Sequence, residues 1–590
     1  MKLSKKIISS FCGDVIPLRI IEGYKAGEVI WECDNDNVFI RKINSNHEKV
    51  ILSLLKEGKS IITADYCGEK LKCHIVIEKM FHALPNEKMN YYIGDFHIHT
   101  SEDHNHDTFF DNSAKCINDI KEEGVLDFSV ISDHADVTDD KFFFNGFENA
   151  EAAGQNSLIV FAGAESEVTD IQTDYYGYSH KNSGEIVTVN SDNFAGVKKW
   201  SDFESKLKNS LLPIGSFAHP QVIGWDENGI WNFNFEKIKT PFLTRMMRMI
   251  EMGNGTPEES NILYEYSYSK ALDCGFKVSP CSTSDHHGPI WSSNQSKGKT
   301  VIMAPQKSKA AFIDAIINNR VYATESGNVK LFYSINGVCA GDIVNVSSEY
   351  KFHVKIGSLN EHIKDKIKCC EVISDYGNKL HTVRNVDFND FEFTIEAKDA
   401  HYFYLRIIDE DGNKTWSAPI WTDRADKFSE KNKGLNRLNK KGFTATDKNG
   451  EDAGLLINSN PSEYWTSSDK NDVIIIDMKE RYSICAVGFY PRRLLIDEFV
   501  DKFELMPFEC ASFVSNFRIS ISNDGEVFKT IYSGCLRVFG GEEIFEFNEC
   551  ECKYIKVDLL STIGAQSGRE KFENAKIKLS EIDFFTNSDI

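Results

Sequence analysis

Histidine and carboxylate side chains recur directly after apolar runs between residues 95 and 290. The run that begins at Tyr91 leads into Asp95, His97 and His99. Later runs lead in the same way to Asp133, His134, Glu165, Glu167, His219, Glu251, Asp285, His286 and His287. Mixed sets of imidazole and carboxylate ligands suit Zn, Fe or Mn better than Ca or Mg. The spacing therefore predicts a transition-metal centre.

His97 and His99 are two residues apart, so in a strand both imidazoles point to the same side and can reach one ion. A carboxylate such as Glu165 can bridge two ions. Taken singly, each residue has a simpler interpretation: His219 as a loop histidine, Glu165 as one arm of an ion pair, Asp133 as a helix cap. The combination, in this order and always after an apolar run, favours the metal centre.

Residues 90–325 must supply the elements that bring these side chains together. Strand-like runs alternate there with helical ones, which is typical of an α/β domain with a parallel sheet or barrel. In a barrel the loops after the strands share one face, so ligands distant in sequence converge. We expect one helix to begin at Thr256, with a capping box to Glu259 and Gly275 as its stop, and a second to follow Ser308 as far as Asn319.

Five short segments of the chain resemble the motifs of a known superfamily. The segments 94–100 (GDFHIHT), 127–134 (DFSVISDH), 163–165 (GAE), 218–220 (AHP) and 284–288 (SDHHG) resemble the successive motifs of the PHP (polymerase and histidinol phosphatase) superfamily. The stretch 315–325 (AIINNRVYATE) is similar to the branch of carbaryl-hydrolase-like metallohydrolases. The resemblance covers about residues 89–345 and implies a distorted (β/α)7 barrel with two or three divalent transition metals, Zn, Mn or Fe.

The resemblance also implies a ligand set. The first ion would take His97, His99, Glu165 and Asp285. Glu165 would bridge to a second ion held by His219 and His180. A third would take His134, His287 and one residue of the stretch 102–107, where His104, His106 and Asp107 all remain open and His106 is favoured. Asp95 and Asp133 would orient imidazoles, and Glu165, Asp285 and His134 would be the catalytic residues.

The function implied is that of a metal-dependent hydrolase, most simply a phosphoesterase acting on a small-molecule phosphoester. A water deprotonated between two ions would attack phosphorus or a carbonyl. Because fold does not determine substrate, two alternatives stay open. One is hydrolysis of a carboxylic ester, carbamate or amide at the same site. The other is a non-catalytic glycan-binding protein.

The flanking regions predict β domains, so the chain as a whole is expected to be multidomain, with the α/β barrel flanked by β-sandwiches. Residues 1–88 resemble a bacterial Ig-like domain, 89–325 form the barrel, and 326–424 a β extension. A basic, Asn-rich linker spans 425–442. Residues 443–590 resemble a discoidin (coagulation factor type C) sandwich, a domain that often binds glycans. Tyr464 and Trp465 could stack on a sugar, but we expect Trp465 to pack in the core.

The composition of the chain limits the classes of partner and the cellular locations that we expect. The net charge of −22, from 67 Lys+Arg against 89 Asp+Glu, excludes nucleic acid and anionic membranes as general partners, because both need concentrated basic residues. No apolar stretch approaches the length of a membrane span. The 15 cysteines form no CxxC pair and the N-terminus resembles no signal peptide, so we expect a cytoplasmic location. An extracellular location stays open if export uses no recognisable signal.

Overall fold

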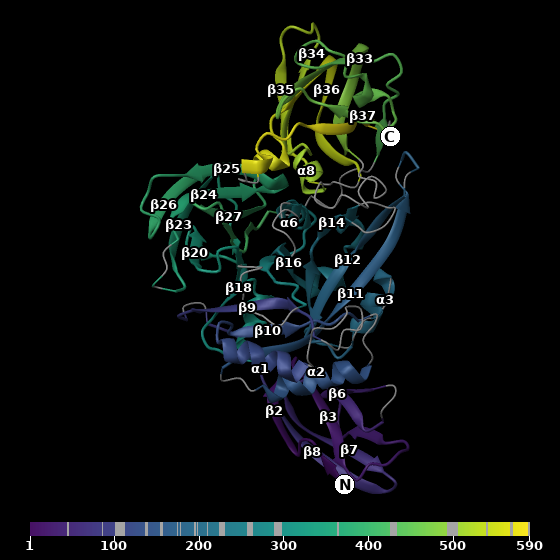
Figure 1. The fold of residues 1–590 in the computed structure, drawn as a ribbon, viewed down its shortest axis with the longest axis vertical. Helices are drawn as coiled ribbons and strands as arrows, with labels where there is room; N and C mark the ends of the chain where they lie inside the picture. Colours follow the sequence, from purple (N-terminus) through teal and green to yellow (C-terminus); the bar gives the residue numbers. More distant parts are fainter. Residues whose placement is uncertain are drawn as a thin grey trace.

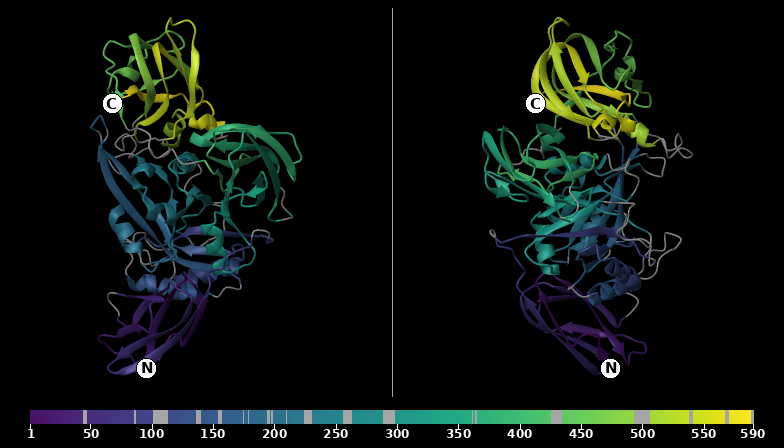
Figure 2. Two further views of the ribbon diagram at one scale, coloured as in Figure 1. Left: turned by 180° about the vertical axis from the view of Figure 1, so that it is seen from behind. Right: turned by 60° about the vertical axis from the view of Figure 1, so that its left-hand side comes forward.

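The computed structural model describes the chain in four successive parts along its long axis (Figure 1). The N-terminal β domain lies at one end, the α/β domain follows, the β extension lies at its side, and the C-terminal β domain lies at the other end (Figure 2). The described residues are all those of 1–590 except 44–46, 85–86, 101–112, 136–139, 154–156, 174, 178, 194–195, 197–198, 209, 224–229, 256–262, 288–297, 361, 363–364, 425–433, 493–505, 538–540, 567–569 and 588–590.

The N-terminal domain consists of two four-stranded sheets, in line with the β character that its sequence predicts. One has the order β1-β3-β6-β5 and the other β2-β8-β7-β4. The strands are β1 (Lys2–Leu3), β2 (Ile7–Phe11), β3 (Val15–Glu22), β4 (Ile30–Cys33), β5 (Val38–Lys42), β6 (Lys49–Leu54), β7 (Gly58–Tyr66) and β8 (Glu69–Glu78). In the second half of β8 every second residue, from Cys73 to Ile77, is buried, which is the period of a half-buried strand.

The α/β domain is built on one large sheet in which the strand order is β17-β16-β13-β12-β11-β10-β9-β18-β19. Its strands are β9 (Asn90–Ile98), β10 (Phe128–Ile131), β11 (Ile159–Thr173), β12 (Ser179–Val189), β13 (Ile214–Ala218), β16 (Met247–Gly253), β17 (Ser279–Ser282), β18 (Lys299–Ala304) and β19 (Val321–Thr324). The pairs β9–β10, β10–β11, β13–β16 and β16–β17 are parallel. A long antiparallel hairpin, β11–β12, separates the two parallel groups.

This sheet is strongly curved. β17 stands at one end of the strand order but contacts β9, β18 and β19. An isolated parallel bridge joins Ile98, at the end of β9, to His286. The curvature therefore brings the carboxyl ends of β9, β10, β13 and β17 toward one region. Strands β10, β13 and β17 are buried along their whole length, as expected for strands covered on both faces.

Helices pack around the sheet: α1 (Ser113–Glu123), α2 (Asp140–Ala152), α3 (Trp200–Leu207), α4 (Phe235–Ile238), α5 (Pro241–Met246), α6 (Tyr264–Asp273) and α7 (Lys309–Ile317). The prediction of α7 is confirmed, because Ser308 Oγ accepts a hydrogen bond from the Ala311 NH at its start. α6 ends before Gly275, whose φ of +84° suits a helix stop. The predicted start of that helix at Thr256 lies outside the described residues.

The β extension shares the large sheet, because β19 pairs with β28 (Lys414–Trp416). Strands β27 (Tyr402–Asp409), β24 (Ile367–Ser374) and β25 (Asn378–Val383) continue the sheet, and β29 (Ile420–Thr422) and β22 (Ile343–Val344) join its side. A second sheet holds β21 (Val338–Cys339), β20 (Val329–Ile335), β23 (Glu349–Ser358) and β26 (Phe391–Glu396). A 3-10 helix, η2 (Asp375–Gly377), lies between β24 and β25.

The C-terminal domain contains a sheet of order β30-β37-β33-β36-β34-β35, with β31 and β32 on its side. The elements are β30 (Leu435–Arg437), β31 (Thr444–Thr446), η4 (Gly454–Ile457), β32 (Trp465–Thr466), β33 (Asp472–Pro491), α8 (Met506–Ala511), β34 (Asn516–Ser522), β35 (Lys529–Cys535), β36 (Glu543–Leu559), α9 (Ile563–Gln566), η7 (Glu570–Phe572) and β37 (Lys578–Asn587). Trp465 is 7% exposed and belongs to this domain's core, as predicted.

All 15 cysteines are unpaired thiols. Within the described part of the chain, no helix has both the length and the apolar character that a membrane span requires.

Candidate metal centre

The predicted ligands gather at the carboxyl ends of the parallel strands. His97 lies in β9 and His99 directly after it, His134 follows β10, and His219 follows β13. Asp285 and His287 follow β17, while Glu165 comes from the hairpin strand β11. All but Asp285, His134 and His287 are buried, and those three are partly buried. The sequence expectation that polar residues after apolar runs converge is therefore met for these seven residues.

The first group contains His97, His99, Glu165 and Asp285, with one donor atom from each within 4.8 Å of the others. His97 Nε2 lies 3.1 Å from Glu165 Oε1 and 3.3 Å from Asp285 Oδ1. His99 Nε2 lies 3.2 Å from Glu165 Oε2 and 3.2 Å from Asp285 Oδ1. Four donors that face one another this closely could hold one transition-metal ion.

A second group joins His134, Glu165 and Glu185. His134 Nε2 lies 3.1 Å from Glu165 Oε2 and 3.9 Å from Glu185 Oε1. His219 is adjacent, since its Nε2 lies 3.1 Å from Glu165 Oε1 and 3.2 Å from Glu185 Oε2. Glu165 thus contributes to both groups, which is the arrangement of a bridging carboxylate.

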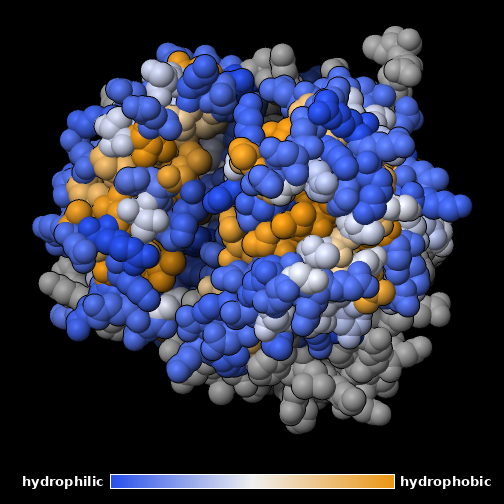
Figure 3. Space-filling model, turned by 90° about the horizontal axis from the view of Figure 1, so that it is seen from above, coloured by the Kyte–Doolittle hydropathy of each residue, from blue (hydrophilic) through white to orange (hydrophobic). Residues whose placement is uncertain are grey.

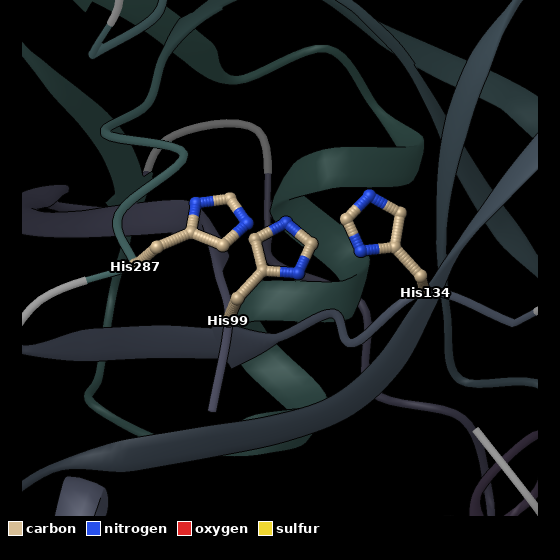
Figure 4. Close-up of side chains that lie close together, drawn as sticks. All are labelled: His99, His134 and His287. Atoms are coloured by element: carbon tan, nitrogen blue, oxygen red, sulfur yellow. The ribbon is translucent and has the colours of Figure 1, made fainter. Parts of the chain in front are cut away.

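The third group consists of His99, His134 and His287 (Figure 4). The three imidazoles lie side by side with His99 in the middle: its ring centroid is 4.5 Å from that of His134 and 4.1 Å from that of His287. The sequence predicted His134, His287 and one residue of 102–107 for this ion; the favoured residue, His106, lies outside the described residues, as do its alternatives His104 and Asp107.

Two of the candidate ligands have backbone conformations that are unusual for residues with a side chain. His219 has a φ of 23° and Asp285 a φ of 46°. Left-handed φ values at non-glycine residues cost free energy and occur often at functional sites. His219 lies directly after β13 and Asp285 lies three residues after the end of β17, and their side chains reach Glu165 and His97.

Glu251, at the end of β16, supports two of the histidines. Its Oε1 lies 2.8 Å from His97 Nδ1, and its Oε2 accepts a hydrogen bond from the His219 NH at 2.7 Å. A carboxylate on Nδ1 holds the ring so that Nε2 faces the other candidate ligands.

The sequence analysis assigned this orienting role to Asp95 and Asp133. In the structure Asp95 accepts from the NH groups of His97 and Ser284, and Asp133 from the NH and hydroxyl of Thr100. Both therefore order the backbone beside the ligands.

The electrostatics of the centre are those of a site for cations. Burial raises the pKa of Glu165, but His97 and hydrogen bonds from His219 and His99 lower it well below its usual value. Burial lowers the pKa of His219, whereas Glu165 and Glu185 raise it to about 10. Burial and the charge of Glu165 raise the pKa of Glu185 to about 7. With protein groups alone, the imidazoles must carry the positive charge that balances these carboxylates.

The donor set fits divalent transition metals. His97 Nε2 and His99 Nε2 lie 3.0 Å apart, so two imidazole nitrogens face each other and need a proton or a cation between them. Within the described part of the chain, each ion pair of Glu165, Glu185 and Asp285 is with a histidine. Nitrogen and carboxylate ligands in this mixture suit Zn, Mn or Fe.

The structure does not bring His180 to the other residues. Its backbone pairs with Gln172, seven residues beyond Glu165 in β11, which is about 23 Å along the strand. Glu185 stands next to His219 instead, and sequence reasoning missed it. The other candidate ligands follow apolar runs, but β12 is antiparallel to its neighbours, so it reaches the same edge of the sheet at its start. The signal was a glutamate directly before the apolar run IVTV.

Comparisons with known proteins add little to this geometry. No family model matches the chain. An uncharacterized protein of Chlamydia muridarum is 27% identical over 255 residues, which are 38% of this chain and 40% of that protein. An uncharacterized protein of Chlamydia trachomatis is 24% identical over 257 residues, with the same shares. The chain thus spans about two fifths of the length of the curated relatives it matches.

Solved structures similar to a quarter of the chain are carbohydrate-binding modules. One is CpGH89CBM32-5 from Clostridium perfringens in complex with GalNAc-beta-1,3-galactose, which is 16% identical, covers 26% of this chain and 100% of its own, and has a TM-score of 0.20. Another is the family 32 module of C. perfringens NanJ in complex with galactose, which is 12% identical, covers 26% of this chain and 99% of its own, and has a TM-score of 0.20.

Proposed function

We propose that the chain is a metal-dependent hydrolase whose centre holds two or three divalent transition-metal ions. The observation that supports this best is the overlap of the three donor groups. His99 belongs to the first and third, His134 to the second and third, and Glu165 to the first and second. Overlapping groups of this kind suit adjacent ions rather than a single one.

We also infer that the curved sheet is a distorted (β/α)7 barrel. The contacts of β17 with β9, β18 and β19 support closure of the sheet. The position of the donor groups at the carboxyl ends of the parallel strands agrees with the face on which such barrels carry their active sites.

In this function the chain's own residues hold and orient the reacting groups. Divalent metals, when bound, act as Lewis acids and lower the pKa of water. The two oxygens of Glu165 face different neighbours: Oε1 faces His97 and His219, and Oε2 faces His99 and His134. Each oxygen thus faces one histidine of the first group and one histidine of or beside the second, so Glu165 would be shared between two ions, with Asp285 and His134 as further ligands. Glu251 maintains the orientation of His97.

Phosphoester hydrolysis is the substrate class that we propose, and it derives from the resemblance of the motifs rather than from a substrate pocket. The test is turnover of p-nitrophenyl phosphate and bis(p-nitrophenyl) phosphate by the full chain with Mn²⁺ or Zn²⁺. We expect His97→Ala to abolish turnover and His353→Ala, a surface histidine of the β extension, to leave it unchanged. Equal rates for wild type and His97→Ala would contradict the proposal. Turnover of p-nitrophenyl acetate alone would favour the ester, carbamate or amide alternative.

Glycan binding by the C-terminal domain is a second candidate. The names of the solved structures reported above accord with it, and one surface feature supports it. Tyr464 is 36% exposed, the Arg492 guanidinium lies 4.2 Å from its ring centroid, and Lys578 Nζ lies 5.8 Å away. An aromatic ring can stack on a sugar, and cationic groups beside the ring can donate hydrogen bonds to the sugar hydroxyls.

The end of the molecule that carries this domain is mostly hydrophilic, with apolar areas on two masses separated by a hollow (Figure 3).

Binding of galactose-containing oligosaccharides, measured by calorimetry, tests the second candidate function. We expect Tyr464→Ala to abolish binding and Tyr482→Ala, a partly buried core tyrosine, to leave the affinity unchanged in the folded fraction. Absence of binding to any tested glycan by the wild type would leave the domain with a structural role.

A further inference from the structure

The hairpin β11–β12 leaves the large sheet at the candidate ligands. β11 pairs with β10 from Ile159 to Ala162, and β12 pairs with β13 from Glu185 onward. Beyond these points, residues 166–173 of β11 pair with residues 179–186 of β12. We call residues 166–184 the ribbon. Glu165 and Glu185 therefore lie at its base, so any change in the angle of the ribbon changes the directions of their carboxylates.

The tip of the ribbon is held by the C-terminal domain. Tyr176 donates its hydroxyl hydrogen to Asp583 Oδ2 at 2.6 Å, and its ring lies 6.0 Å from that of Tyr490. The Arg437 guanidinium, which pairs with Asp583, lies 4.2 Å from the ring centroid of Tyr175 and 5.4 Å from that of Tyr176. The tip thus packs on a charged and aromatic surface of β30, β33 and β37.

A second contact reaches the segment of His219. Gln221, two residues beyond His219 and 1% exposed, donates a hydrogen bond from Nε2 to the Arg537 carbonyl at 3.0 Å. Arg537 is itself held in place, because its guanidinium is buried and pairs with Asp273 of α6 and with Glu543. The backbone carbonyl that Gln221 meets therefore belongs to a fixed residue of the C-terminal domain.

The domain is anchored on α6 by an apolar contact as well. Leu263 and Tyr264, at the start of α6, form one core cluster with Cys510, Phe513 and Ile563 of the C-terminal domain. Tyr266 Oη lies 2.9 Å from Ser515 Oγ. An interface with a shared core and buried ion pairs holds two domains in one orientation, whereas a small polar interface permits relative motion.

We propose that the C-terminal domain is a positioning element for the second metal position, the one formed by His134, Glu165 and Glu185 with His219. The inference rests on the proposed function, because it assumes that this group binds an ion. Tyr176 and Gln221 are positioning residues, because each ties a ligand-bearing segment to the same rigid domain through its hydrogen bond. Two of the carboxylate ligands and His219 depend on these ties.

The experiment compares Mn²⁺ binding by the full-length wild type, Tyr176→Phe, Gln221→Leu and the double variant. Phenylalanine and leucine retain most of the side-chain volume, so folding is expected to be kept, and circular dichroism checks it. The matched control is Lys309→Met, which removes a mostly buried ion pair with Asp14 at the opposite end of the α/β domain. The readouts are ions bound per chain at increasing Mn²⁺ and the electron paramagnetic resonance spectrum.

We expect the wild type to bind at least two Mn²⁺ ions and to give an exchange-coupled spectrum. The double variant should need about tenfold more Mn²⁺ for the second ion, in line with the effect of residues that support metal ligands. At intermediate loading it should therefore give the spectrum of isolated ions, while Lys309→Met behaves as the wild type. Equal binding by wild type and double variant would overturn this inference and leave the proposed function standing. A wild type that binds no Mn²⁺ or Zn²⁺ would overturn both.

Discussion

The two terminal β domains dock at opposite ends of the parallel strands, and their interfaces differ in kind. The N-terminal domain contacts α2, α7 and the loops at the amino ends of the strands: Lys309 Nζ lies 2.7 Å from Asp14 Oδ1, and Asn190 Nδ2 donates to the Gly13 carbonyl at 2.9 Å. The C-terminal domain contacts the ribbon, the His219 segment and α6. One domain therefore lies at the face far from the donor groups and the other beside it.

This difference separates stabilisation from a role in the site. In barrel-like α/β domains, residues at the carboxyl ends of strands serve function, and those at the amino ends serve stability. We expect changes at the N-terminal interface to alter the free energy of unfolding alone. Changes at the C-terminal interface should alter both the free energy of unfolding and metal affinity.

The largest effect is expected from Asp273→Ala at the C-terminal interface. The variant leaves the buried Arg537 guanidinium with Glu543 as its remaining carboxylate partner and also removes the nearer of the two acceptors of Tyr402 Oη. Breaking a buried ion pair from one side costs about 3–5 kcal/mol. Urea denaturation of the full chain measures this loss in the free energy of unfolding. Asp14→Ala is the control at the N-terminal interface. A loss below about 1 kcal/mol would show that Arg537 does not anchor the domain.

The second prediction concerns pH and the core of the C-terminal domain. Glu581 is buried, and burial raises its pKa to about 7 although Lys440 beside it opposes the shift. Because the folded state holds this proton more tightly than the unfolded state, stability falls as pH rises from about 4.5 to 7 and is level above that. The loss amounts to about 3 kcal/mol.

Glu581→Gln should remove this pH dependence. Thermal unfolding of the wild type and the variant between pH 4.5 and 8 measures the difference in stability between the two proteins at each pH. A stability difference that is constant across this range would contradict the prediction. Arg19→Gln, a variant at the N-terminal interface, is the control and should retain the pH profile of the wild type.

The third prediction uses metal addition. An ion at about 100 times its dissociation constant stabilises the state that binds it by about 2.7 kcal/mol. We expect Mn²⁺ to slow amide hydrogen exchange in β9, β11, β12 and α6, while exchange in β7 and β8 of the N-terminal domain stays the same. Slowing in β7 and β8 equal to that in β9, β11, β12 and α6 would remove the distinction drawn between the two interfaces.

The smallest effect is expected from Arg19→Gln. Arg19 Nε lies 2.9 Å from Glu148 Oε1, but the side chains are 39% and 22% exposed. Exposed ion pairs contribute about 0.2–1 kcal/mol. The melting temperature should fall by no more than a few degrees, and the number of Mn²⁺ ions bound per chain should stay that of the wild type. A change in metal binding would show that the N-terminal interface also reaches the centre.

Much of the candidate centre was predictable from local sequence. His97 and His99 are two apart in a strand, and the residues after β10, β13 and β17 follow apolar runs that end at the same edge of the sheet. The period of a strand and the direction of parallel strands are local properties, so these candidate ligands could be named before the structure. The start of α7 was predictable for the same reason, because Ser308 is a local cap.

Glu185 and Glu251 were not predictable in their roles. To predict the role of Glu185, one must know that β12 runs antiparallel to its neighbours. To predict the role of Glu251, one must know the curvature of the sheet, which places β16 beside His97 and His219. His180 shows the converse: the motif favoured it, but the length of the hairpin carries it away from Glu165.

The sequence by itself determined most of the side chains that could bind metals, the β character of both terminal regions and the burial of Trp465. These follow from residue type, spacing and periodicity, which act over a few residues. Only the tertiary structure decided which carboxylate stands beside His219, which one orients His97, and that the C-terminal domain holds the ribbon at Tyr176. Those outcomes depend on strand direction and domain docking, which are set by contacts between residues hundreds of positions apart in the chain.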